Sequence, residues 1–454
     1  GEKLYKHVLN DNIKNDQLIY HEKDRTFDNY LYKTKSNKYI VLSHFSTLAS
    51  DFQLISADNP NKKLKRFTPR LKKHLYGVGH IGNEFYIISN WNAKNFRLMK
   101  TNENKTNRKH WEELVPHRKT VFLDDNFECF NSYIVLNERI KGLPNIRILN
   151  LKNETSYYIK FKESAYTCSI SDRNLDFNTD IVRYSYTSLT TPFSTYEYNM
   201  KTKKKKLLKI LKVVGGYNQK KYFTERIFAK SRDGKKIPIS LVYRKDKFKK
   251  PGKLLLYAYG SYGATMNPYF SIPRLSLLDR GFCFAIAHIR GGKIYDENWY
   301  EDGKLLKKKN TFYDYIDCAE FLIKKKYTQK EHLYAEGGSA GGLLMGAILN
   351  IKGNIFNGVT AAVPFVDVVN TMLDDTIPLT TFEYDEWGNP SNKKYFDYML
   401  SYSPYDNVEK KDYPNILITS GFFDSQVQYW EPLKWIAKLR DYKTNKNILL
   451  LDMN

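Results

Sequence analysis

Along residues 1 to about 217, short apolar runs alternate with polar stretches that favour turns. The runs are four or five residues long and come in pairs, and the first members of the pairs begin near positions 39, 85, 133 and 181, a period of 46 to 48 residues. A repeat of this length is typical of a β-propeller, in which each blade is a sheet of roughly four strands. We predict a partial β-propeller of about four to five blades over residues 1–217; a β-sandwich or an irregular sheet is the alternative.

The pattern changes in residues 218–454, where the strand-like runs become almost continuously apolar and helical runs separate them. Alternating buried strands and helices predict a doubly wound sheet, that is, an α/β domain. The residues Thr311-Phe312-Tyr313-Asp314 fit a capping box at the start of one helix. The expected strands are residues 237–243, 253–260, 282–289, 331–335, 359–363, 415–420 and 447–451, and the expected helices are residues 275–280, 311–324, 342–350 and 430–439.

One glycine-rich turn stands between a strand and a helix of this second half. Gly337-Gly338-Ser339-Ala340-Gly341 matches the pattern G-x-S-x-G of a nucleophile elbow. The glycines permit a sharp turn that exposes Ser339, and the helix that follows directs its N-terminal amides and its positive dipole end to the same place. We interpret Ser339 as a nucleophile rather than as part of an ordinary turn, and we predict the α/β-hydrolase fold.

In that fold the acid of a catalytic triad follows the serine along the chain, just after a later strand. Asp424 follows the strand that ends at Ser420 and is the candidate; a simple surface-loop aspartate is the alternative. Three other aspartates also follow a strand, but one strand earlier: Asp367, Asp374 and Asp375.

The histidine of a triad has no candidate after the serine. His332, seven residues before Ser339, is the last histidine in the sequence. His288 lies inside a predicted buried strand and is interpreted as structural. Because loss of the base costs a comparable serine hydrolase roughly 10⁶ in turnover, we expect these 454 residues by themselves to be almost inert.

The formal net charge of +24 raises the possibility of a polyanion partner. The basic residues are mostly lysines spread along the chain, and their densest cluster, residues 201–206, is typical of a solvated hairpin tip. We therefore expect a lysine-rich surface and no nucleic-acid partner. No apolar run approaches the roughly 20 residues that a membrane span needs, so no membrane partner is expected. Four cysteines without paired spacing indicate reduced thiols and a cytoplasmic protein.

Several longer motifs of the second half, in order along the chain, resemble the oligopeptidase B (protease II) branch of the prolyl oligopeptidase family of serine peptidases. The similarity is dense from about residue 243 to residue 451 and weaker through the strand repeats. The motifs are residues 259–263 (YGSYG), 274–281 (RLSLLDRG), 298–304 (NWYEDGK), 337–345 (GGSAGGLLM), 363–369 (VPFVDVV), 386–390 (EWGNP), 402–408 (YSPYDNV) and 424–432 (DSQVQYWEP).

The resemblance implies an α/β-hydrolase domain with a seven-bladed propeller that admits only short peptides, and cleavage after Lys or Arg. It implies Ser339 as nucleophile and Asp424 as triad acid, with an oxyanion hole formed by the Tyr259 hydroxyl and the Ala340 amide. It also implies that Glu383 and Asp385 bind the basic side chain of a peptide substrate, as carboxylates pair well with a guanidinium. No metal or cofactor is implied.

The sequence departs from the family pattern at several places. Asn267 and Tyr269 stand where acidic residues that recognise a second basic residue are usual, and Phe423 replaces a usual histidine. The family's catalytic histidine would come shortly after residue 454, and its N-terminal helical segment and first blades are missing, so a chain truncated at both ends is expected. The rivals are an esterase or aminopeptidase on the same fold, and a non-catalytic binding protein. The oligomeric state is not predicted.

Overall fold

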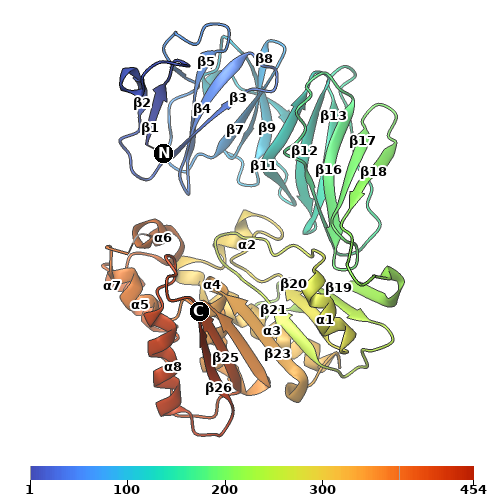
Figure 1. Cartoon of the computed structure of the whole chain (residues 1–454), viewed down its shortest axis with the longest axis vertical. Coiled ribbons are helices and arrows are strands. Elements are labelled where there is room, and N and C mark those ends of the chain that lie inside the picture. The colour runs from blue at the N-terminus through green and yellow to red at the C-terminus, as the bar shows by residue number, and fades with distance from the viewer. Residues whose placement is uncertain (1, 378) are drawn as a thin grey trace. The chain divides into compact units, whose positions relative to one another are not determined.

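The computed structural model describes residues 2–377 and 379–454. In residues 3–210, after a two-stranded hairpin, four four-stranded sheets follow one another (Figure 1). Each sheet uses four strands that are consecutive in the chain, which is the arrangement of propeller blades. The hairpin is β1 (Lys3–Lys6) and β2 (Gln17–His21), and the sheets are β3 (Asp28–Lys33), β4 (Tyr39–Phe45), β5 (Ser50–Ser56) and β6 (Lys65–Arg66); β7 (Tyr76–Ile81), β8 (Glu84–Ser89), β9 (Arg97–Asn102) and β10 (Glu112–Val115); β11 (Val121–Phe130), β12 (Tyr133–Ile140), β13 (Leu143–Asn150) and β14 (Thr155–Tyr158); and β15 (Tyr166–Ile170), β16 (Ile181–Ser188), β17 (Ser194–Asn199) and β18 (Lys205–Ile210).

The repeat of 46 to 48 residues has a simple structural origin. The predicted pairs correspond to the two central strands of each sheet, beginning with β4 and β5 and ending with β16 and β17. Among these central strands, β4 and β5 are buried on both faces and strongly apolar, whereas β6 and β18 at the sheet edges are exposed. The hydrophobic pattern could thus reveal the central pair of every blade and not the edge strands.

Residues 222–453 form one eight-stranded sheet in the order β19-β20-β22-β21-β23-β24-β25-β26. The first two strands pair antiparallel, β20 also runs antiparallel to β22, and every later pair is parallel. Parallel neighbours bring their carboxyl ends to one edge of the sheet, where ligands bind in doubly wound folds. The strands are β19 (Tyr222–Lys230), β20 (Lys236–Arg244), β21 (Leu254–Tyr257), β22 (Cys283–Ala287), β23 (Leu333–Gly338), β24 (Gly358–Ala362), β25 (Asn415–Ser420) and β26 (Leu449–Met453).

Helices pack on both faces of this sheet, because successive side chains of a buried strand point to opposite faces. On one face, Leu254 and Leu256 of β21 share a core with α3, α4 and α8. On the other face, Leu255 and Tyr257 pack in a separate cluster that includes Leu278 of α1. The helices are α1 (Ile272–Asp279), α2 (Glu297–Glu301), α3 (Lys309–Lys324), α4 (Ala340–Lys352), α5 (Val368–Leu373), α6 (Thr380–Trp387), α7 (Lys393–Leu400) and α8 (Trp430–Tyr442).

The predicted capping box at Thr311 is wrong. The α3 helix begins two residues earlier, at Lys309, and its N-cap Lys308 makes no side-chain cap hydrogen bond. The Thr311 hydroxyl is buried and donates instead to the backbone carbonyls of Arg290 and Gly303. The Thr311 hydroxyl therefore makes tertiary hydrogen bonds instead of capping the helix, which is the role that the local sequence pattern predicted.

The chain divides into two compact units. One comprises residues up to 160 with 168–185 and 195–208; the other comprises residues 161–167, 186–194 and 209–454. The proposed boundary between residues 217 and 218 stays a prediction. In the part of the chain that the structure describes, no helix is long and apolar enough to cross a membrane.

Candidate active site

Ser339 occupies the tight turn between β23 and α4. Its backbone has φ 57° and ψ −120°, a conformation that a residue with a side chain adopts only when its surroundings impose it. The Ser339 amide donates to the Ala362 carbonyl at 2.9 Å, and the Ser339 carbonyl accepts from Gly342 at 2.8 Å, which fixes the turn from both sides. A Cβ at Gly337 would lie 2.3 Å from the Gly341 carbonyl oxygen, so the motif glycine is sterically required.

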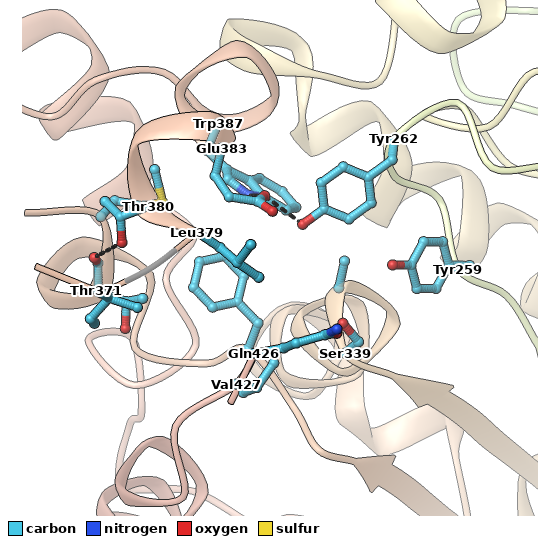
Figure 2. Close-up of a pocket in the computed structure, with 14 residues that line it drawn as sticks. Tyr259, Tyr262, Ser339, Thr371, Leu379, Thr380, Glu383, Trp387, Gln426 and Val427 are labelled. Carbon is cyan, nitrogen blue, oxygen red and sulfur yellow. Dashed lines mark hydrogen bonds between the residues drawn. The ribbon is translucent and has the colours of Figure 1, made fainter. Parts of the chain in front are cut away.

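The predicted oxyanion donors lie at the same cavity as Ser339. Tyr259 and Ala340 both line a cavity of about 140 Å³ with the serine. Tyr259 follows β21, Ala340 is the first residue of α4, and Figure 2 shows the Tyr259 hydroxyl pointing into this cavity. Burial raises the pKa of the Tyr259 phenol, which keeps it a neutral donor, while a hydrogen bond with the Ser339 side chain acts in the opposite direction. The geometry is suited to stabilising negative charge that develops beside Ser339.

A carboxylate lies in the same cavity. The Glu383 Oε2 atom accepts from the Tyr262 hydroxyl at 2.6 Å and from the Trp387 indole N–H at 2.7 Å (Figure 2). These are neutral donors, and no ion pair among the described residues involves Glu383. Apolar side chains complete the wall around it: Phe365, Met372, Ile377, Leu379 and Val427.

The pKa of Glu383 is raised above the ordinary value of a glutamate. Burial is the largest cause, and the negative charge of the nearby Glu386 adds to it, while the hydrogen bonds from Tyr262 and Trp387 lower the pKa. A carboxylate in these surroundings lacks a cationic partner of its own. The site is therefore complementary to a cation that enters from the cavity.

Asp385 does not share this cavity. It lies on the same helix as Glu383 but is exposed, and the cavity is lined by Thr380, Glu383 and Trp387 of α6. Residues two apart on an α-helix point about 200° apart, whereas residues three or four apart share a face. The predicted pair of Glu383 and Asp385 thus occupies two different faces of α6.

Sequence reasoning missed Tyr262 and Trp387, which donate to Glu383. It also missed Lys308 and Glu386, an ion pair that contacts the Trp387 ring and the Tyr262 amide. The spacing of Thr380, Glu383 and Trp387 is helical and could have revealed α6, which is absent from the helices expected from the sequence. The contacts of Tyr262 with α6 join residues 121 and 124 positions apart, which no local pattern reveals.

Asp424 lies in the loop after β25, near the cavity but not in its wall. Its Oδ1 atom accepts from the backbone amides of Gln426 at 2.8 Å and Val427 at 3.1 Å. Both of these neighbours line the cavity beside Ser339. The loop is also tied to β26, because the Phe422 amide donates to the Asn454 carbonyl at 2.8 Å.

The two histidines closest to Ser339 in the sequence belong to other parts of the sheet. His332 precedes β23, whose six residues separate it from the serine by about 20 Å at an ordinary strand rise. His288 is buried and shares a 2.8 Å hydrogen bond with the Ser240 hydroxyl. Neither histidine lines the cavity.

Comparison with known proteins identifies both halves of the chain. The N-terminal β-propeller domain of prolyl oligopeptidase matches residues 1–210, and the prolyl oligopeptidase family model matches residues 268–454. The chain belongs to the prolyl oligopeptidase family. The resemblance inferred from the motifs and the predicted fold class, a partial propeller followed by an α/β-hydrolase domain, are both confirmed.

Individual relatives within the prolyl oligopeptidase family cover the chain from end to end. Dipeptidyl aminopeptidase BI of Pseudoxanthomonas mexicana is 46% identical over 100% of this chain and 62% of its own length. Protease 2 of Moraxella lacunata is 39% identical over 99% of this chain and 65% of its own length. The structure of oligopeptidase B from Leishmania major matches with a TM-score of 0.93 at 38% identity, over 100% of this chain and 65% of that one.

The chain thus spans somewhat less than two thirds of the length of these relatives. The roles of the six predicted site residues stay predictions: Ser339, Asp424, Tyr259, Ala340, Glu383 and Asp385.

Proposed function

We propose that this protein is a serine peptidase that hydrolyses short peptides after Lys or Arg through an acyl-enzyme. The observation that carries the proposal is the position of Glu383 in one cavity with Ser339, bound by two neutral donors and by no cation among the described residues. A guanidinium or ammonium group bound to Glu383 would bring the adjoining peptide carbonyl to the serine. Membership of the prolyl oligopeptidase family supports the same chemistry.

In the proposed reaction the Ser339 hydroxyl attacks the peptide carbonyl, and an acyl-enzyme forms as the amine leaves. The Tyr259 hydroxyl and the Ala340 amide donate to the oxygen of the tetrahedral intermediate, where negative charge exists only in that state. Asp424 would orient and stabilise the base of the triad. No metal or cofactor takes part in this scheme.

The test uses the protein expressed from its natural gene and purified, together with its Ser339→Ala variant. Peptides with mixed sequences are digested, and the products are identified by mass spectrometry. We expect cleavage after Lys and Arg and a loss of turnover on the order of 10⁶ in the variant. Cleavage without preference for basic residues, or activity that survives in the variant, would contradict the proposal.

A dipeptidyl aminopeptidase is the second candidate function, because the relative that is 46% identical over the whole chain carries that name. This activity requires a free amino end two residues before the cleaved bond. Dipeptide amides with free and with blocked amino groups separate the two functions. An internal peptidase cleaves the blocked amide, whereas a strict dipeptidyl aminopeptidase cleaves the free one alone.

We also propose a cytoplasmic location. The four cysteines are buried and form no disulfide with one another, as is usual where thiols stay reduced. Cell fractionation with an antibody against this chain tests the location, and recovery with extracellular material would refute it.

A further inference from the structure

A buried ion pair lies behind the wall of the cavity. The Lys308 ammonium group is 4.0 Å from the Glu386 carboxylate, and both side chains are less than 5% exposed. Glu386 lies on α6, three residues after Glu383, and Lys308 precedes α3. Two buried charges of opposite sign this close compensate each other.

The pair contacts the loop that carries the predicted oxyanion donor, Tyr259. Lys308 Nζ donates to the Gly260 carbonyl and to the Ser261 hydroxyl, each at 2.7 Å. The Glu386 Oε1 atom accepts from the Tyr262 amide at 3.1 Å. Lys308 and Glu386 therefore link this loop to α6.

The loop needs such support because its backbone is unusual. Gly260, Tyr262 and Gly263 have positive φ values of 78°, 57° and 65°. For Tyr262, whose hydroxyl donates to Glu383, this conformation is unfavourable without tertiary contacts. The same ion pair thus helps to position a donor that binds the pocket carboxylate.

The charges matter as well as the contacts. Glu386 acts electrostatically on Glu383, raising the pKa of that carboxyl. An ammonium group at Lys308 offsets the charge of Glu386, which leaves the cavity with one uncompensated negative charge, on Glu383. One such charge matches the single positive charge of a lysine or arginine side chain.

We propose that Lys308 and Glu386 are specificity-determining residues of this site. Because their charges compensate each other, the Glu383 pocket keeps one net negative charge and prefers a ligand side chain with one positive charge. The inference rests on the proposed function, since it concerns the same pocket. Neither residue touches the substrate in this account, so both act by position and charge.

The electrostatic surroundings of the pair set its pH behaviour. The pKa of Lys308 is lowered from 10.5 to about 8. Burial is the largest cause and lowers the pKa, while the charge of Glu386 acts in the opposite direction. If Glu386 were neutral, the Lys308 pKa would fall further. The titratable groups that face the pair from its own helix and from neighbouring elements are Glu383, Tyr259, Tyr262, Tyr300 and Tyr402.

The experiment measures benzamidine binding to the 454-residue protein by titration calorimetry from pH 6 to pH 9.5. The variants are Glu386→Gln, which leaves the lysine charge uncompensated, and Glu386→Gln/Lys308→Met, which removes both charges. Circular dichroism confirms that each variant is folded.

At the acid end of the range, where Lys308 is most protonated, we expect Glu386→Gln to bind benzamidine more weakly than the double variant, because a buried positive charge repels the ligand, and the difference should shrink as the pH rises. The difference should vanish near pH 9, where Lys308 is neutral in the single variant. Equal affinities at pH 6, or a difference that does not change with pH, would overturn the inference.

If Glu386→Gln does not fold, the parent chain and the double variant answer the same question. Their affinities should agree below pH 7, and the parent should bind several-fold more tightly at pH 9.5, where Glu386 loses its compensating charge. A constant ratio overturns the inference. If the parent chain does not bind benzamidine at all, the proposed pocket for a basic side chain fails, and the inference fails with it.

Discussion

Glu383 and Asp385 offer a matched pair of single carboxylates on one helix. Glu383 lines the cavity beside Ser339, whereas Asp385 is exposed on another face of α6. We expect Glu383→Gln to weaken benzamidine binding by about 30-fold or more, because a charge-assisted hydrogen bond in a partly buried site is lost, about 2 kcal/mol.

The matched change Asp385→Asn should alter the affinity by less than about threefold, since interactions between exposed charges are screened by solvent. Calorimetric titration of both variants at one pH and salt concentration checks the pair. Equal losses of affinity in the two variants would mean that Asp385 also contributes to the pocket, which would contradict the geometry of α6.

The candidate site illustrates how far single residues could be predicted. Ser339 was identifiable because its motif lies within five consecutive residues and the strained backbone needs glycines nearby. Lys308 and Glu386 were not, because their roles depend on contacts across 78 positions, and Lys308 stands in an ordinary run of three lysines. Lys308 belongs to the site because it is buried, and its burial depends on the tertiary fold, which the local sequence does not reveal.

Glu431, at the start of α8, provides a test of how helices hold the cavity wall. Its side chain is fully buried and accepts from the amides of Val366 and Asp367, at 2.8 and 2.9 Å, and from the Thr371 hydroxyl at 2.8 Å. Burial, as the largest cause, raises the pKa of Glu431 from 4.5 to about 7, against the effect of these hydrogen bonds. The helix end thus binds the segment that leads to α5 and to the cavity residues Thr371 and Met372.

The sign of the pH effect follows from the raised pKa. The unfolded chain loses the Glu431 proton near pH 4.5 and the folded chain near pH 7, so the stability due to this proton is present below pH 4.5 and is lost as the pH rises through 7. At about 1.4 kcal/mol per pKa unit, the loss is on the order of 3 kcal/mol.

Glu431→Gln is the matched variant, because its amide can keep a carbonyl oxygen toward the two backbone donors. We expect the free energy of unfolding, measured by urea denaturation between pH 4.5 and pH 8, to fall more steeply with pH in the parent than in Glu431→Gln. Parallel curves would contradict the account.

Among the secondary elements, long or strongly apolar ones were predicted and short polar ones were not. The expected strand 415–420 agrees with β25, and the helix 430–439 agrees with most of α8. The α6 helix was missed because six of its eight residues are aromatic or acidic and its amphipathic character is weak. Since α6 carries Glu383, Glu386 and Trp387, the segment most informative about substrate preference was the one least visible in the sequence.

For the chain as a whole, the two hydrophobic periods were sufficient to predict a propeller-like half and an α/β half. Both patterns reflect burial, in central blade strands such as β4 and in strands of the large sheet such as β22. The edge strands of the blades and β19 were not predicted; β18 is exposed along its whole length, and β19 gives a mixed pattern.

The 454 residues by themselves should not support catalysis. No histidine follows Ser339 in this sequence, and His332 lies at the far end of β23. We expect the chain, expressed alone, to hydrolyse a blocked arginine amide no faster than its Ser339→Ala variant, within the sensitivity of a fluorogenic assay. Hydrolysis that depends on Ser339 in this chain would mean that another group acts as the base.

The most direct test of the central claim compares two substrates that differ in a single charge. Citrulline has nearly the shape of arginine but is neutral, so a blocked peptide amide ending in arginine is matched by the same amide ending in citrulline. For the protein purified from its natural source, we predict a kcat/KM at least about 100-fold higher for arginine, because the Glu383 pocket is built around an uncompensated carboxylate. Equal kcat/KM values for the two substrates would contradict the claim that this site recognises a basic side chain.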